Sequence, residues 1–233
     1  MKVEIWSDVV CPWCHIGKRR FEAALARFAH RDDVEVVWRS FELAPDAPRH
    51  MTEPLDRHLA SKYGVPLEQA RAMQQRMTGT AADEGLTFRF DIARSGNTFD
   101  AHRVLHLAAE RGVQDAVKEA FFRAYLTDGE PIGDPDTLVR VAAGAGLDAD
   151  EVRRVLGQGT YGDAVRADER EAAALGVSGV PFFVVDRTYG VSGAQPAELL
   201  LEVLEKAWAD AHPLTLVTSG TDDASCADGS CAV

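Results

Sequence analysis

The order of hydrophobic and polar positions predicts a strand, a helix and a second strand at the start of the chain. Residues 2–8 form a short apolar run that is typical of a buried strand. Residues 12–30 place apolar side chains at helical spacing, with Ile16 and Phe21 on one face. Residues 33–43 alternate between two faces, which predicts another strand. Elements in this order form the unit of a pair of parallel strands.

The middle of the chain is helical in pattern. Residues 44–54 contain three prolines and no clear period, so we expect a loop there. Helical spacing then continues from about 55 to 175, and Gly64 and Pro66 mark the first boundary between helices. The expected helices cover residues 55–63, 66–84, 98–111, 114–127, 135–145, 149–157 and 160–175.

Strand character returns near the end of the chain. Phe182–Val185 and Tyr189–Ser192 predict a hairpin, and Pro196 introduces an amphipathic helix over 196–211. The two β-containing ends would have to form one sheet, with the helical block inserted between them. We therefore expect an α/β fold with a large all-helical insertion. The expected domains are residues 1–45 together with 176–211, the insertion 46–175, and a C-terminal tail 212–233 with a CxxxxC motif.

Composition narrows the class of protein and of partner. The chain has 233 residues, of which 46% are hydrophobic and 27% charged, as in ordinary soluble globular proteins. Its net charge of −12 argues against nucleic acid or an anionic membrane as the main partner, because both bind basic faces. No apolar run is long enough to cross a bilayer, and the N-terminus lacks the pattern of a signal peptide. We therefore expect a cytoplasmic protein, in which paired cysteines are more often catalytic, redox-sensing or metal-bound than structural.

The first cysteine pair follows the first strand and opens the first helix, in the motif Cys11-Pro12-Trp13-Cys14. Cys11 would lie at the helix N-terminus, where free N–H groups and the helix dipole stabilise a thiolate and lower its pKa. Pro12 suits the first helical position, because its φ angle is already helical. Cys14 would lie one turn further, close enough to form a disulfide with Cys11. This placement favours a redox couple.

A second motif precedes the third predicted strand. Pro181 stands directly before the apolar run 182–185, with Gly179 upstream. Proline cannot donate to a strand ladder, so it belongs at the start of a strand, and we expect the Val180–Pro181 bond to be cis. A redox dithiol needs a backbone edge that holds an extended substrate beside its sulfur. Val180 and Pro181 are candidates for that edge.

Together these motifs resemble the DsbA family of thioredoxin-fold oxidoreductases, in particular its FrnE-like branch. The matching segments are residues 7–14, 97–103 and 176–183, and the resemblance covers about residues 1–211. The resemblance implies a thioredoxin-like fold with a large helical insertion. It also implies thiol–disulfide exchange with protein substrates, without a metal or other cofactor, and with glutathione or another thiol as electron donor.

The resemblance assigns roles to single residues. Cys11 would be the attacking thiolate, Cys14 would resolve the mixed disulfide, and Pro181 would shape the substrate edge. The expected substrate contacts are Pro12, Trp13, Val180 and Asn97. Asn97 is included because this region lies near the thiol-ligand site of the related kappa-class glutathione transferases; it is otherwise a simple helix cap together with Thr98.

The two residues between the cysteines bear on the redox potential. The motif of DsbA itself has His between its cysteines, whereas Pro12 and Trp13 bring no charge that would stabilise a thiolate. We therefore expect a couple less oxidising than DsbA, in the range of about −180 to −270 mV spanned by disulfide isomerase and thioredoxin. Such a potential suits a reductase or isomerase.

The second cysteine pair, Cys226 and Cys231, lies in the last eight residues. A CxxxxC near the C-terminus is common in the FrnE-like branch. The pair is either an auxiliary redox pair that passes electrons to Cys11 and Cys14, or a locally stabilising pair. Replacing both with serine should lower turnover only in the first case.

Other interpretations stay open beside the oxidoreductase. The two cysteine pairs could form one zinc site, although their separation is unusual for it. His102 and His106, four residues apart, could face a metal or be ordinary helix residues, and Asp8 could tune the cysteines or simply end the strand. A glutathione-dependent isomerase or transferase of the kappa-like branch is the main alternative function. That branch typically has Ser in place of Cys11 and lacks the pair, which favours redox chemistry here.

Overall fold

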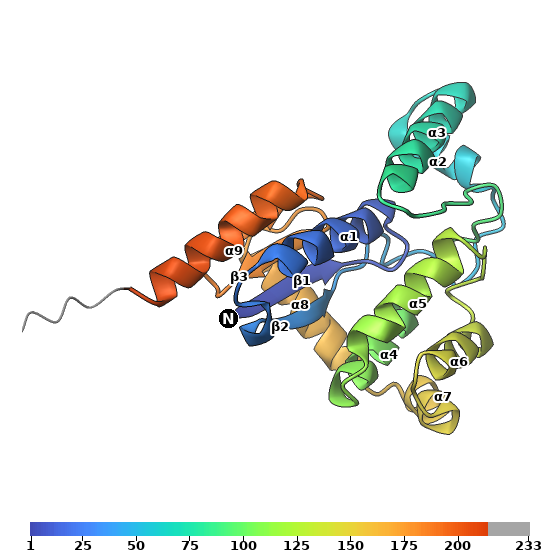
Figure 1. The fold of residues 1–233 in the computed structure, drawn as a ribbon. Helices are drawn as coiled ribbons and strands as arrows, with labels where there is room; N and C mark the ends of the chain where they lie inside the picture. Colours follow the sequence, from blue (N-terminus) through green and yellow to red (C-terminus); the bar gives the residue numbers. More distant parts are fainter. Residues whose placement is uncertain (214–233) are drawn as a thin grey trace, which may run out of the picture.

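The computed structural model of the chain describes residues 1–213. Both ends of this range contribute to one four-stranded sheet, with the order β2-β1-β3-β4 (Figure 1). β1 is parallel to β2 and antiparallel to β3, and β3 pairs antiparallel with β4. The predicted joining of the two β-containing ends is therefore confirmed. The strands are β1 (Lys2–Ser7), β2 (Glu35–Ser40), β3 (Phe182–Val185) and β4 (Tyr189–Ser192).

The helices occupy the segments where the sequence predicts them, with ends close to those expected. Gly64, at the end of the first helix of the middle block, has a positive φ of 63°, which glycine adopts without strain. A short 3-10 helix covers Arg31–Asp33. The α-helices are α1 (Pro12–Arg27), α2 (Leu55–Tyr63), α3 (Leu67–Asp83), α4 (Phe99–Glu110), α5 (Gln114–Leu126), α6 (Pro135–Gly144), α7 (Ala149–Gln158), α8 (Gly162–Ala174) and α9 (Ala197–Ala211).

Helices cover both faces of the sheet. α1 and α9 lie side by side on one face, where Ile5, Phe21 and Phe183 belong to one buried cluster (Figure 1). α8 packs on the other face, where Trp6 and Val184 are buried. Alternate residues of β1 thus face opposite layers, as a strand covered on both sides requires. The last helix of the expected insertion therefore also forms a layer of the sheet domain.

The remaining helices stand beside this core. α4, α5, α6 and α7 pack mainly on one another, and α4 and α5 also contact β2. α2 and α3 form a separate pair that stands near the first turn of α1 (Figure 1). No helix of the described residues is long and apolar enough to span a bilayer. This arrangement brings elements of the insertion close to the start of α1, where the two cysteines lie.

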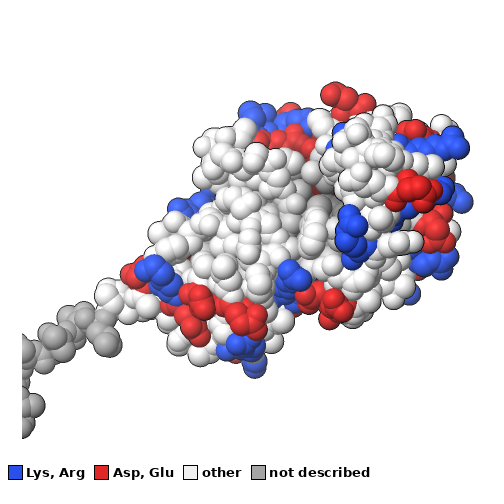
Figure 2. Space-filling view, turned by 90° about the horizontal axis from the view of Figure 1, so that it is seen from above, with Lys and Arg blue, Asp and Glu red and all other residues white. Residues whose placement is uncertain are grey.

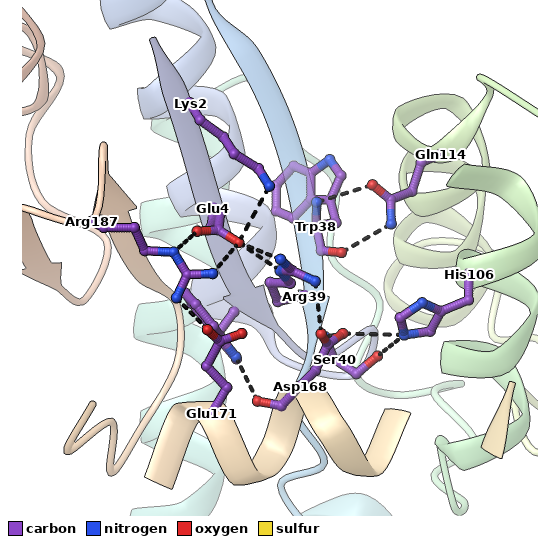
Figure 3. Close-up of polar contacts among 11 residues, drawn as sticks. Lys2, Glu4, Trp38, Arg39, Ser40, His106, Gln114, Asp168, Glu171 and Arg187 are labelled. Carbon is purple, nitrogen blue, oxygen red and sulfur yellow. Dashed lines mark hydrogen bonds and ion pairs between the residues drawn. The ribbon is translucent and has the colours of Figure 1, made fainter. Parts of the chain in front are cut away.

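A buried ionic network joins the sheet to α8 and α4 (Figure 3). Glu4 of β1 is 1% exposed and accepts hydrogen bonds from Arg39 at 2.8 Å and from Arg187 at 2.9 Å. Arg39 also donates to Asp168 of α8 at 3.0 Å, and Asp168 lies 3.1 Å from His106 of α4. Burial acts to raise the pKa of Asp168, but His106, the Ser40 N–H and Arg39 together lower it. Each buried carboxylate therefore has several partners, as a buried charge requires.

Candidate active site

The CPWC motif forms the start of α1 in the predicted way. Cys11 is the residue before the first helical turn, with φ −86° and ψ 113°, and Pro12 takes the first helical position. The N–H groups of Cys14 and His15 lie 3.1 and 3.4 Å from the carbonyl oxygen of Cys11. Both cysteines are free thiols, and Cys11 is 4% and Cys14 0% exposed. Trp13 between them is 43% exposed.

The second motif lies beside the first in space. The Val180–Pro181 peptide bond is cis, as the sequence predicts. The Cys11 thiol donates a long hydrogen bond to the carbonyl oxygen of Val180, with a sulfur–oxygen distance of 3.7 Å. Residues separated by 169 positions thus meet at one point. The Val180–Pro181 segment therefore lies where the sequence predicts a substrate edge, and its role in binding substrate stays a prediction.

A glycine permits this approach. Gly17 lies on the side of α1 that faces Pro181, and a Cβ atom placed there would be 2.9 Å from Cγ of Pro181. Real Cβ atoms do not come that close, so any other residue would push α1 and Pro181 apart. No sequence pattern indicates this role of Gly17, because only the fold shows which residue lies opposite it.

A groove of about 380 Å³ opens next to Cys11. Cys11, Trp13 and Val180 form one side, and the loop after β2 contributes Leu43 and Met51. The opposite wall comes from α2 and α3 and is mostly apolar: Leu55, Leu59, Tyr63, Met73 and Met77. The methionines suit a surface that adapts to different apolar groups. Elements of the helical insertion therefore form part of the groove beside Cys11.

The charge of the groove differs from that of the chain as a whole. Apart from the cysteine, its titratable lining residues are His58, Lys62, Tyr63 and Tyr125, and no Asp or Glu of the described residues lines it. Seen from above in Figure 2, Lys, Arg, Asp and Glu gather toward the edge of the molecule, and its middle is largely uncharged. A larger hollow of about 640 Å³ lies between α2, α3 and residues 88–93 and contains neither Cys11 nor Cys14. The groove beside Cys11 is therefore the candidate substrate site.

Asn97 has a different place from the one expected. Its amide group donates to Glu42 at 3.2 Å and to the carbonyl oxygen of Pro45 at 2.9 Å. Its side-chain oxygen accepts from the N–H of Phe99 at 2.9 Å, so it caps α4. It is not among the residues that line the groove. Asn97 therefore holds the loop whose Leu43 lines the groove, and its direct contact with substrate stays a prediction.

Two titratable groups lie buried behind the cysteines. Asp8, at the turn between β1 and α1, is 0% exposed and lies 3.4 Å from Nε2 of His102 on α4, which is 1% exposed. Burial acts to raise the pKa of Asp8, but His102, the Leu43 N–H and the Lys118 charge lower it. Burial lowers the pKa of His102. His102 and His106 face different carboxylates, and within residues 1–213 no group of three or more His, Cys, Asp or Glu could hold a metal.

A third buried group was missed in the sequence. Lys118 of α5 is 0% exposed, and its ammonium donates to the carbonyl oxygen of Ser7 at 3.2 Å. A signal was present, because Lys118 stands at helical spacing from Phe121 and Phe122 and therefore on the apolar face of its helix. Lysine on such a face is rarely fully buried without a partner.

The expected lowering of the Cys11 pKa is wrong for the reduced pair. The hydrogen bond with Cys14, then burial, then the charge of Cys14 raise the pKa of Cys11 well above its ordinary value, and Asp8 adds to the effect. Two neighbouring sulfurs cannot both carry a negative charge cheaply, so the pair loses one proton and holds the second. The helix N-terminus alone therefore does not lower the pKa of Cys11 in the reduced pair. The other predicted pair, Cys226 and Cys231, lies outside the described residues.

Comparisons with known proteins agree with this arrangement. The family model described as DSBA-like thioredoxin domain matches residues 2–205. The crystal structure of a probable DsbA oxidoreductase from Streptomyces coelicolor is 53% identical, with a TM-score of 0.87, and the match covers 95% of this chain and 97% of that chain. The uncharacterized protein YwbO of Bacillus subtilis is 29% identical over 210 residues, which are 89% of this chain and 96% of that protein.

A more distant neighbour shares the fold. The cytosolic disulfide reductase DsbM from Pseudomonas aeruginosa, solved with GSH, is 20% identical with a TM-score of 0.60. The match covers 89% of this chain and 99% of that chain. At this identity the likeness shows the fold alone.

Proposed function

Because the chain belongs to the DsbA-like thioredoxin domain family, we propose that it is a thiol–disulfide oxidoreductase of the reductase or isomerase type that acts on protein disulfides. The observation that carries the proposal is the contact between the Cys11 sulfur and the Val180 carbonyl, at the end of an apolar groove. An extended substrate in the groove would have its own disulfide next to the sulfur that attacks it. The assignment to the FrnE-like branch stays a prediction from the motifs.

The proposed exchange has two steps. The Cys11 thiolate attacks one sulfur of the substrate disulfide, and the other substrate sulfur leaves with the electron pair of the broken bond. The Cys14 thiolate then attacks the Cys11 sulfur, the Cys11–Cys14 bond forms, and the second substrate sulfur leaves as a thiolate. Two electrons thus pass from the dithiol to the substrate. An external thiol returns them.

The donor and the compartment follow from the same proposal. We propose glutathione or a similar small thiol as donor, because the structural neighbour from Pseudomonas aeruginosa was solved with GSH. That neighbour is a cytosolic disulfide reductase, which supports a cytoplasmic setting for this chain. The charge of the groove supports an anionic thiol, since Lys62 and His58 line it and no carboxylate of the described residues does.

Reduction of insulin disulfides by dithiothreitol tests the proposal. The Cys11→Ser variant should lose at least about 100-fold of the catalysed rate, because the attacking sulfur is gone. The Cys14→Ser variant is the matched control, since it makes the same chemical change one turn further along α1. It should accumulate a mixed disulfide that non-reducing electrophoresis detects, because the resolving thiol is absent. A Cys11→Ser variant with the parent rate would contradict the proposal.

A second candidate is a glutathione-dependent isomerase with a small-molecule substrate. The groove volume of about 380 Å³ supports it, because this is the size of ordinary small-molecule sites. The Cys14→Ser variant separates the two functions. An isomerase would retain its rate in this variant, since it needs glutathione and no second sulfur, whereas an oxidoreductase would stop at the mixed disulfide.

A further inference from the structure

The ammonium of Lys118 is buried without a carboxylate partner among the described residues. Nζ donates to the Ser7 carbonyl at 3.2 Å and lies 5.1 and 5.6 Å from the ring centres of Phe122 and Trp38. No Asp or Glu oxygen of residues 1–213 lies within 4.0 Å of it. Aromatic faces and one carbonyl offset only part of the cost of removing an ammonium from water. Lys118 therefore has no direct ion pair within residues 1–213, and Asp8 and Asp115 act on it only from beyond 4.0 Å.

Lys18 shows how this chain stabilises a buried lysine elsewhere. It is 2% exposed on α1, and its ammonium forms ion pairs with Glu22, with Asp115 at 3.2 Å and with Glu119 at 3.2 Å. Lys18 is thus surrounded by carboxylates, whereas Lys118 has no direct carboxylate partner among the described residues. A negative charge that forms only in part of the reaction cycle would therefore gain more from Lys118 than from Lys18.

The groups around Lys118 identify that charge. Cys14 and Cys11 act on it from α1, Asp8 from the turn after β1, and Asp115 from its own helix. His102 acts from α4 and opposes a positive charge when it is protonated. Burial lowers the pKa of Lys118 to about 8, and among the groups that raise it Cys14 comes first. A negative charge on Cys14 would therefore stabilise the ammonium of Lys118.

We propose that Lys118 is the counter-charge that stabilises the thiolate of the Cys11–Cys14 pair, chiefly on Cys14, and so positions the resolving step. This inference rests on the proposed thiol–disulfide exchange. In that step the Cys14 thiol gives its proton to solvent or to a neutral Lys118 amine. Its electron pair then forms the bond to the Cys11 sulfur, and the substrate sulfur leaves with the electron pair of the broken bond. The helical insertion would thus supply the positive charge that Pro12 and Trp13 do not.

The role has a consequence for the oxidised protein. When Cys11 and Cys14 form a disulfide, the thiolate charge disappears and Lys118 keeps only Asp8 and Asp115 against its burial. Oxidation then favours the neutral amine, because a buried ammonium without a partner is costly. Lys118 would therefore release part of a proton on oxidation and bind it again on reduction.

The experiment follows thiolate absorbance in the ultraviolet as a function of pH. It uses the Cys11→Ser protein, in which Cys14 is the only sulfur of the pair, with and without Lys118→Met. Methionine keeps the packing against Trp38 and Phe122 and removes the charge. We expect the titration midpoint to rise by about one pH unit or more, which is a tenfold loss of thiolate below the midpoint. In the protein with both cysteines, the equilibrium constant with glutathione should shift about tenfold towards the disulfide, or about 30 mV.

Two further variants control for structure. Lys18→Met removes a buried lysine that is already paired, so its midpoint should stay within about 0.3 units of the parent. Lys118→Arg keeps the charge and should keep the midpoint closer to the parent than Lys118→Met does. Thermal unfolding of Lys118→Met should show equal or greater stability, because the variant no longer buries an ammonium.

Several results would overturn the inference. An unchanged midpoint in Lys118→Met would show that the charge does not act on the thiolate. Loss of folding in Lys118→Met, or an equal shift in Lys18→Met, would show that the residue is structural. The titration needs no substrate, so it is separate from the insulin assay. A shifted midpoint without insulin reduction would leave this inference standing and remove the proposed function.

Discussion

The molecule contains two buried polar clusters near β1, and they differ in how completely they are paired. In the network around Glu4 and Asp168, each carboxylate has several cationic or N–H partners. In the cluster behind the cysteines, Ser7 Oγ and His102 Nδ1 lack hydrogen-bond partners among the described residues, and Asp8 Oδ1 and His102 Nε2 have only each other, at 3.4 Å. Fully paired networks hold elements together, whereas unpaired buried groups cost stability and persist where chemistry uses them. The paired network around Glu4 supports the fold, whereas the incompletely paired cluster around Asp8 lies at the candidate site.

The largest effect is expected from breaking the paired network. Glu4→Ala should lower the free energy of unfolding by about 4 kcal/mol, because it leaves two guanidinium groups without their shared carboxylate. Denaturation by urea measures the change. Glu198→Ala, which removes an exposed pair with Arg27, is the matched control and should cost below about 0.5 kcal/mol. The midpoint of the thiolate titration should stay unchanged in Glu4→Ala; a shift like that of Lys118→Met would erase the distinction between the clusters.

The pH dependence of stability tests the incompletely paired cluster, through Lys118. The pKa of Lys118 is about 8 in the folded chain and about 10.4 in an unfolded one. Between these values the unfolded state binds more protons at Lys118, so this residue should add about 3 kcal/mol of stability as pH increases from about 8 to 10. The raised pKa of Cys11 acts in the opposite direction in both proteins, so the Lys118 contribution is the difference between the parent and Lys118→Met. Urea denaturation of the reduced protein at each pH measures it. The rise should be absent in Lys118→Met, and an equal rise in both proteins would contradict the assignment.

The next largest effect is expected at Gly17, where α1 approaches Pro181 closely. Gly17→Ala should lower the free energy of unfolding by about 1 to 2 kcal/mol and slow insulin reduction, because the methyl group would displace Pro181 from α1. Gly79→Ala is the matched control, since this glycine also lies inside a helix and a Cβ atom there meets nothing within 4 Å. It should stabilise the protein by about 0.5 to 1 kcal/mol. Equal effects of the two changes would show that Pro181 does not depend on Gly17.

The smallest effect is expected at Asp8. The Cys14 hydrogen bond is the first cause of the raised pKa of Cys11, and the Asp8 charge is a weaker one. Asp8→Asn should therefore lower the pH of thiolate formation by less than about one unit, because it removes a negative charge next to the sulfurs. Ultraviolet thiolate titration of the reduced protein measures the shift. A shift upward would mean that Asp8 acts mainly through Lys118, whose charge it helps to maintain.

The sequence predicted the parts of this molecule that depend on local pattern. Helical spacing, the proline after Cys11 and the apolar run after Pro181 led to the elements and to the two motifs that meet at the site. The neighbours of each residue were harder to predict. The roles of Gly17 and Lys118 depend on residues that are distant in the sequence, Pro181 and Ser7. The side chain of Asn97 forms a hydrogen bond with the Pro45 carbonyl, which the sequence does not predict either. The predicted acidity of Cys11 failed for the same reason, because it considered one helix end, whereas the sulfur pair decides the pKa.

Lys118 and the cysteines reach the same place from separate parts of the chain. The cysteines come with the first strand and helix, and the lysine comes with α5, roughly a hundred positions later. If Lys118 stabilises the thiolate as proposed, two proteins with the same CPWC motif will differ in redox potential when their insertions differ at this one position. Exchanging the helical insertion, with the CPWC motif unchanged, would then be a way to change the redox potential of such a protein.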